Sequence, residues 1–214
     1  MKKENFSVKD MITTALWIAV VTVVTMSIVI PIPLTQGYVN LGDSVVFLGV
    51  YLLGRRNGMI AAGIGAALAD VLIGYTAFAP FTLIIKAAMA FIFGSFLIFS
   101  AGKITPQSKK VPASSILGIG LATLLMAGGY YLAEWLITGN SVTPVVSIPW
   151  NILQGSIGGI LALLLMATLG GIRMPKQVQK EEKPANVSSK DNVEQEVVEE
   201  VEAEIVSTRQ NDGF

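Results

Sequence analysis

Six long apolar runs alternate with short polar segments along the first 172 residues of the chain. The runs cover about residues 11–30, 41–54, 59–75, 80–101, 114–138 and 149–172. Charged residues are nearly absent from the runs and concentrate at their borders, which is typical of membrane-spanning helices. We therefore predict an all-α integral membrane protein with six transmembrane helices, and a membrane domain that covers residues 1–172.

The second and third runs are shorter than the others. A helix needs about 20 residues, at roughly 1.5 Å each, to cross the hydrocarbon core. We expect these two spans to tilt little, to begin inside the loops or to include irregular backbone. Such backbone is stable at membrane depth only where protein or a cavity covers it.

The first run also has the features of a signal peptide. No small-residue cleavage site follows it, however, and Pro31 and Pro33 come directly after about 20 apolar residues. We expect this run to be a retained first helix.

Basic residues border the runs on one side only. They are Lys2, Lys3, Lys9, Arg55, Arg56, Lys103, Lys109, Lys110, Arg173, Lys176 and Lys180. The three other connections, at about 31–40, 76–79 and 139–148, contain no lysine or arginine. Basic loops stay in the cytoplasm, so we predict a multi-pass protein of the cell membrane with both termini cytoplasmic.

Residues 173–214 differ from the rest of the chain in composition. The stretch from 175 onward holds ten of the fifteen acidic residues and ends in a segment rich in Glu and Val. A short helix is one interpretation, but we favour a solvated and largely disordered cytoplasmic tail.

Composition narrows the possible chemistry. The chain is 52% hydrophobic and 14% charged, and it contains neither cysteine nor histidine. The usual general base and the commonest metal ligands are therefore missing, and the sequence has no phosphate-binding loop. We expect no catalytic residue, metal, cofactor or nucleic-acid partner. Energy for uphill transport would have to come from partner subunits.

Four charged residues lie in or at the rim of the runs: Asp43, Asp70, Lys86 and Glu134. A charge at the bilayer centre costs about 2.5–3.5 kcal/mol on insertion scales, so such groups should face the bundle interior and be paired. We predict an ion pair between Asp70 and Lys86, with Lys86 also contacting a ligand.

Polar residues on several helices lie at one depth. Asp70, Lys86, Glu134 and Gln154 each lie about 7–9 Å from the non-cytoplasmic end of their helices, at roughly 1.5 Å per residue, and Asn151 lies one helical step from Gln154 on the same face. The inner halves of the runs are almost purely apolar, which indicates a closed pocket that opens outward rather than a pore. We predict a binding site made of Tyr38, Asn40, Lys86, Glu134, Trp135, Asn151 and Gln154. Interhelical hydrogen bonding is the alternative for the two amides.

Several segments resemble the substrate-binding S components of energy-coupling factor (ECF) vitamin transporters. They are 38–43 (YVNLGD), 62–65 (AGIG), 68–70 (LAD), 80–86 (PFTLIIK) and 150–155 (WNILQG). The resemblance implies a six-helix protein that captures a vitamin and docks on a transmembrane coupling subunit with two ATPase subunits. It also implies that Ala15 and Ala19, an A-x-x-x-A pair, form the docking surface. The subgroup suggests a vitamin B6 or hydroxymethylpyrimidine ligand.

Three functions are compatible with the residues. The first is the binding subunit of a multi-subunit importer, which is not itself an enzyme. The second is an autonomous secondary carrier or channel, which would transport without an ATPase. The third is a membrane enzyme with Asp70 and Glu134 as an acid–base pair, but no nucleophile or metal cluster accompanies them. We favour the importer subunit.

Overall fold

The computed structural model describes residues 7–101 and 114–169. Its elements are α1 (Val8–Ser27), β1 (Ile30–Pro31), β2 (Tyr38–Val39), α2 (Gly42–Leu72), α3 (Ala79–Ala101), α4 (Ser114–Thr138), the 3-10 turn η1 (Thr143–Val146) and α5 (Ser147–Leu169). The predicted all-α fold is thus confirmed, with one pair of two-residue strands in addition. The predicted tail at 173–214 lies outside the described residues.

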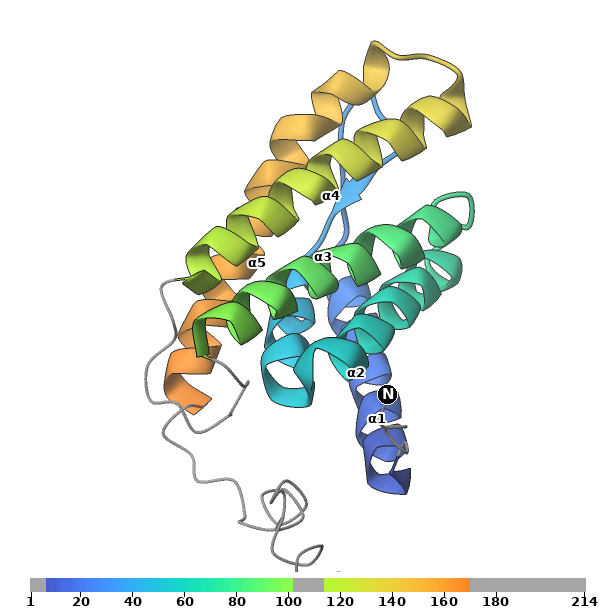
Figure 1. The fold of residues 1–214 in the computed structure, drawn as a ribbon. Helices are drawn as coiled ribbons and strands as arrows, with labels where there is room; N and C mark the ends of the chain where they lie inside the picture. Colours follow the sequence, from blue (N-terminus) through green and yellow to red (C-terminus); the bar gives the residue numbers. More distant parts are fainter. Residues whose placement is uncertain (1–6, 102–113, 170–214) are drawn as a thin grey trace, which may run out of the picture. The chain divides into compact units, whose positions relative to one another are not determined.

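Helix α2 contains both of the short apolar runs. It is interrupted at Gly54, whose φ of 82° and ψ of 169° are not helical, and the chain turns sharply there (Figure 1). Glycine adopts such a φ without steric cost. The first arm, residues 42–53, is only about 18 Å long at 1.5 Å per residue, which is too short to cross a membrane.

The break at Gly54 lies at the expected boundary between the second and third runs, next to Arg55 and Arg56, but the count of six spans is not confirmed. Within the described residues, five helices are long and apolar enough to cross a membrane. The two arms of α2 stay close after the break: a Cβ atom at Gly58 would lie 2.6 Å from the Cα atom of Val50. The reversal is therefore part of the packed core.

Small residues allow the other helices to approach α2 closely. A Cβ atom at Gly65 would lie 2.8 Å from the backbone oxygen of Ile18 in α1, and one at Gly63 would lie 2.8 Å from that of Leu83 in α3. Thr22 of α1 also donates a 2.9 Å hydrogen bond to the Gly65 carbonyl. These small residues thus serve internal packing between the helices.

A hydrophobic core fills the space between the helices below the polar residues. Its largest fully buried side chains include Phe47, Phe93, Met89, Met126 and Met166. Phe47 and Phe93 pack edge to face, with ring centres 5.0 Å apart, an arrangement that aromatic quadrupoles favour. This core connects α2, α3, α4 and α5.

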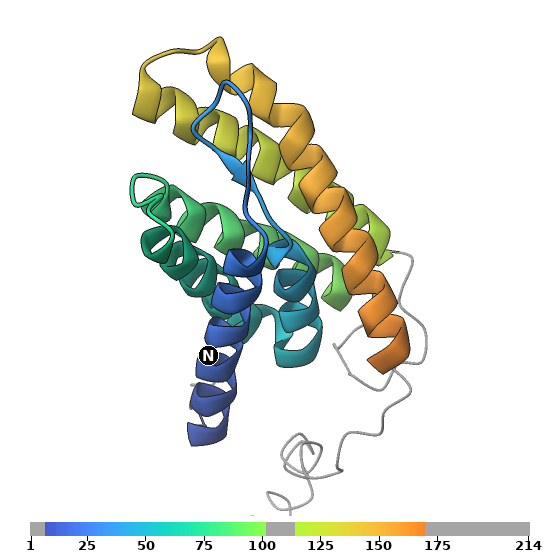
Figure 2. The same ribbon diagram turned by 180° about the vertical axis from the view of Figure 1, so that it is seen from behind.

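The segment between α1 and α2 crosses the bundle. Its two short strands pair antiparallel, with Ile30 opposite Val39. Both views show the segment running between the α4–α5 pair and the helices α2 and α3 (Figures 1 and 2). We call residues 30–41 the crossing loop.

The helix ends that border basic segments lie at one end of the molecule. The start of α1, the break in α2, the end of α3, the start of α4 and the end of α5 all lie there (Figure 1). The turns after α2 and α4 lie at the opposite end. Cytoplasmic placement of the basic end stays a prediction of the positive-inside rule.

Candidate ligand-binding site

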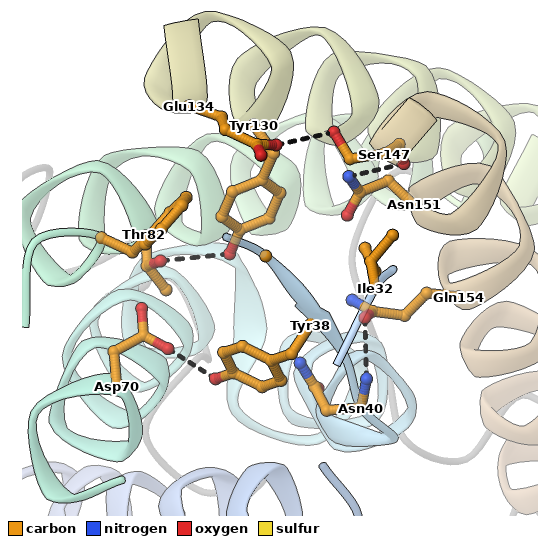
Figure 3. Close-up of a pocket in the computed structure, with 12 residues that line it drawn as sticks. Ile32, Tyr38, Asn40, Asp70, Thr82, Tyr130, Glu134, Ser147, Asn151 and Gln154 are labelled. Atoms are coloured by element: carbon orange, nitrogen blue, oxygen red, sulfur yellow. Dashed lines mark hydrogen bonds between the residues drawn. The ribbon is translucent and has the colours of Figure 1, made fainter. Parts of the chain in front are cut away.

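A cavity lies under the crossing loop, at the end of the bundle opposite the basic segments. Its walls come from α2, α3, α4, α5 and the loop (Figure 3). The lining residues are Ile32, Gly37, Tyr38, Asn40, Asp70, Phe78, Thr82, Tyr130, Glu134, Ser147, Asn151 and Gln154. The structure thus brings together five of the seven predicted binding residues, together with Asp70.

Glu134 projects from α4 into the cavity and is 1% exposed. Its Oε1 accepts a 2.9 Å hydrogen bond from the backbone N–H of Gln36, and its Oε2 accepts one of 3.0 Å from the Ser147 hydroxyl. Within the described residues no lysine or arginine pairs with this carboxylate. Both of its partners are therefore neutral donors, and one of them belongs to the crossing loop.

Asp70 is the second carboxylate of the cavity and comes from the end of α2. One of its oxygens accepts a short hydrogen bond from the Tyr38 hydroxyl, whereas Oδ2 is buried and has no hydrogen-bond partner in the described part of the chain. Burial and the neighbouring Asp70 charge raise the pKa of Tyr38 above its ordinary value. The phenol therefore stays protonated and remains a donor to Asp70.

Two amides of α5 face the cavity together. Asn151 donates from Nδ2 to the Ser147 carbonyl at 3.0 Å, which leaves its own carbonyl oxygen pointing into the cavity (Figure 3). Gln154 accepts a 2.8 Å hydrogen bond at Oε1 from the backbone N–H of Asn40. Both amides are at most 5% exposed, so they face the protein interior rather than lipid.

Lys86 is buried but does not line the cavity, and its predicted ion pair with Asp70 is wrong. Its ammonium pairs with Asp43 at the start of α2 instead. It also lies 3.1 Å from the sulfur of Met126 and 5.6 Å from the ring centre of Tyr130. Position along the sequence puts Asp43 and Asp70 at a similar depth, so it could not show which of them pairs with Lys86. In the structure, Asp70 instead accepts a hydrogen bond from Tyr38 of the crossing loop.

Trp135 was expected in the site but does not line the cavity. It is 42% exposed and lies beside Tyr131, with ring centres 6.5 Å apart. Successive helical residues point about 100° apart, because a turn holds 3.6 residues. The orientation that buries Glu134 therefore turns Trp135 outward.

Two hydroxyl residues of the cavity were not predicted. Ser147 precedes Asn151 and Gln154 at helical spacings of four and seven, so all three share one face of α5. Thr82 lies one turn before Lys86 and accepts a 3.2 Å hydrogen bond from the Tyr130 hydroxyl. Ser147 and Thr82 could have been identified from these helical spacings to polar residues that the sequence analysis had already selected.

The predicted docking residues Ala15 and Ala19 are exposed on α1. Helix α1 packs chiefly against α2, and the two alanines lie one turn apart on the surface that this packing leaves open. The structure is compatible with a close helix–helix contact at this position, since small side chains allow backbones to approach.

Comparison with protein families gives a match over most of the chain. A sequence model of the family described as "ECF-type riboflavin transporter, S component" matches residues 5–170. This range includes every helix described above and ends before the acidic tail.

Two curated proteins are similar to the chain. An uncharacterized protein of Pyrococcus woesei is 37% identical over 155 residues, which are 71% of this chain and 98% of that protein. The thiamine precursor transporter HmpT of Lactococcus lactis subsp. cremoris is 26% identical over 163 residues, which are 76% of this chain and 88% of that protein.

Proposed function

Because the chain belongs to the family of ECF-type riboflavin transporter S components, we propose that it captures a small heteroaromatic vitamin or precursor for an ATP-driven importer. One observation carries the choice of site: two buried carboxylates, Asp70 and Glu134, line a single cavity with no cation paired to either in the described residues. Such groups need donors, and a ligand can supply them.

The crossing loop contributes Ile32, Gly37, Tyr38 and Asn40 to the lining of the proposed site. The free space in the cavity is about 20 Å³, which is enough for about one water molecule. A ring-sized ligand therefore requires the loop to move outward. The Gln36 N–H, the Asn40 N–H and the Tyr38 hydroxyl would then leave their acceptors, and ligand donors would replace them. The loop acts in this proposal as a lid.

The chemistry of the cavity favours a ligand with several N–H or O–H groups. Glu134 and Asp70 contribute carboxylate oxygens, while Asn151 and Gln154 contribute carbonyl oxygens, and all of these are acceptors. An aminopyrimidine of the hydroxymethylpyrimidine type supplies an amino group, a hydroxyl and a flat ring for the Tyr130 face. The similarity to a thiamine precursor transporter supports this ligand over vitamin B6, the other candidate.

Uptake requires partner proteins in this proposal. The sequence contains no phosphate-binding loop, so ATP hydrolysis is assigned to two ATPase subunits that act through a transmembrane coupling subunit. The exposed pair Ala15 and Ala19 on α1 is the proposed contact with that coupling subunit. Replacing both with Leu should abolish co-purification of the coupling subunit without changing ligand affinity.

Direct binding tests the proposal. We expect the purified chain in nanodiscs to bind the aminopyrimidine more tightly than pyridoxine or riboflavin, as measured by calorimetry. We expect Glu134→Gln to weaken binding at least tenfold, about 1.4 kcal/mol, because the amide removes a charge and one acceptor. An unchanged affinity in this variant would mean that Glu134 does not contact the ligand.

Proteoliposomes separate the importer from the autonomous carrier. Uptake should require the coupling subunit, both ATPases and ATP. Uptake by the purified chain alone would instead support the secondary-carrier interpretation.

A further inference from the structure

A buried ion pair lies beneath the cavity without lining it. The side chains of Lys86 and Asp43 are 3% and 0% exposed, and they join α3 to the first turn of α2. Burying two charges carries a desolvation cost that their attraction offsets only partly. The pair lies next to the cavity without lining it, so a role in addition to stability has to come from the residues that it contacts.

The pair reaches two cavity-lining residues: Lys86 lies over the Tyr130 ring, and Asp43 is hydrogen-bonded to Gln154. Asp43 Oδ2 accepts a 2.8 Å hydrogen bond from Nε2 of Gln154, while its other oxygen pairs with Lys86. An ionised carboxylate is only an acceptor, and the ammonium of Lys86 is only a donor. The NH₂ end of Gln154 must therefore face Asp43.

Fixing the NH₂ end of the Gln154 side chain also fixes where its carbonyl oxygen points. With Nε2 held by Asp43, Oε1 of Gln154 faces the cavity, where it accepts the Asn40 N–H at 2.8 Å. Close packing maintains this arrangement one turn later on the same helix face. A Cβ atom at Gly158 would lie 2.6 Å from the Cβ atom of Asp43, so α5 lies against the start of α2 with little room to shift.

We infer that Lys86 and Asp43 are positioning residues that fix Gln154 as an acceptor, and that this selects ligands with an N–H donor at that edge over ligands with an oxygen that can only accept. The inference rests on the proposed function. When the loop opens, the N–H of Asn40 leaves and a ligand N–H takes its place. A ligand oxygen that can only accept would instead face Oε1, and two buried acceptors would remain unpaired.

A matched pair of ligands tests the inference. The hydroxymethyl-aminopyrimidine and its 4-methoxy analogue differ in one group, an N–H donor in the first and an oxygen that can only accept in the second. We expect the wild-type chain in nanodiscs to bind the amine at least about tenfold more tightly, because the methoxy oxygen leaves an acceptor unsatisfied.

The double variant Asp43→Asn/Lys86→Met removes both charges and keeps a polar partner for Gln154. Removing the two charges together avoids an uncompensated buried charge. Since an asparagine side chain can donate or accept, Gln154 is free to reverse. We expect the preference for the amine to fall below about threefold, while the variant still binds.

A second double variant keeps the inference testable if the first does not fold. Asp43→Asn/Gln154→Glu exchanges the acid and the amide across one hydrogen bond and leaves the net charge unchanged. A glutamate at 154 can only accept, so the preference for the amine should return to at least tenfold. A role limited to holding the helices together predicts no such difference between the two double variants.

Three results would overturn the inference: equal binding of the two ligands by the wild type, a preference of at least tenfold kept by the neutral double variant, or a preference lost in the exchange variant. Failure of the proposed function has a different signature. The wild-type chain would then bind neither pyrimidine, nor pyridoxine, nor riboflavin.

Discussion

The outer and inner halves of this bundle bury different kinds of polar groups. Around the cavity the buried side chains include three carboxylates, one ammonium and two amides: Asp43, Asp70, Glu134, Lys86, Asn151 and Gln154. Towards the basic end, the polar side chains buried among the described residues are hydroxyl-bearing, and the core itself is Phe47, Met89, Phe93 and Met166.

The two halves also differ in what their contacts connect. Inner contacts join helix to helix through large apolar side chains and close glycine approaches. Outer contacts join helix side chains to the crossing loop, through the backbone N–H groups of Gln36 and Asn40 and the hydroxyl of Tyr38. In the proposed function, ligand contacts replace these loop contacts, so the inner half should determine stability and the outer half should determine binding.

The largest expected effect comes from a cavity in the inner half. Phe93 is fully buried against Phe47, so Phe93→Ala should lower the free energy of unfolding by about 3–5 kcal/mol. Unfolding by denaturing detergent would measure the loss. Phe99→Ala is the matched control, because Phe99 lies on the same helix and is 90% exposed.

The folded fraction of Phe93→Ala should keep its ligand affinity within about twofold, which is under 0.5 kcal/mol. A tenfold loss of affinity with unchanged stability would break the proposed separation between the two halves.

A glycine at the boundary between the halves should affect both properties. Gly158→Ala forces a Cβ atom against Asp43, and such overpacking costs about 1–3 kcal/mol. Because Gln154 lies one turn away and contacts the same aspartate, ligand affinity should fall as well. Both stability and affinity would be measured on one preparation.

Gly128→Ala is the control for this substitution. No atom lies within 4 Å of a Cβ built at Gly128, and an alanine there should stabilise α4 by about 0.5–1 kcal/mol. If Gly158→Ala behaved like this control, α5 would not depend on its close approach to α2.

The difference between the halves explains what the sequence could predict. Common depth is a property of helix geometry, so Glu134, Asn151 and Gln154 were expected together and do line one cavity. The choice between Asp43 and Asp70 as partner of Lys86 depends on how helices rotate and on where the loop settles. Neither can be read from spacing along one chain.

The sharpness of the reversal at Gly54 could not be predicted for a related reason. Two short runs separated by Arg55 and Arg56 indicated a break at this position, but they do not say how sharply the chain turns there. The tight packing of Gly58 on Val50 is a tertiary contact. A hydropathy pattern therefore found the apolar runs but not the number of complete crossings.

The hydroxyl of Tyr38 offers a test of the loop alone. Tyr38→Phe removes the donor to Asp70, which leaves a buried acceptor unpaired in the closed state and costs it about 1–3 kcal/mol. The loop should open more often, so stopped-flow association of the aminopyrimidine should be faster by about fivefold or more. Tyr131→Phe is the control, because the Tyr131 hydroxyl donates to the backbone carbonyl of Ser141, in the exposed segment after α4. An unchanged association rate in Tyr38→Phe would mean that this contact does not hold the loop closed.

The smallest expected effect tests the border of the site. Trp135 follows Glu134 directly, yet it is 42% exposed and does not line the cavity. Trp135→Leu should therefore change ligand affinity by less than about 0.5 kcal/mol, within twofold by calorimetry. Glu134→Gln, one residue away, should lower ligand affinity at least tenfold. Equal losses in the two variants would mean that α4 rotates when the loop opens and brings Trp135 to the ligand. The difference between these neighbouring residues thus measures whether the closed arrangement of the helices persists during binding.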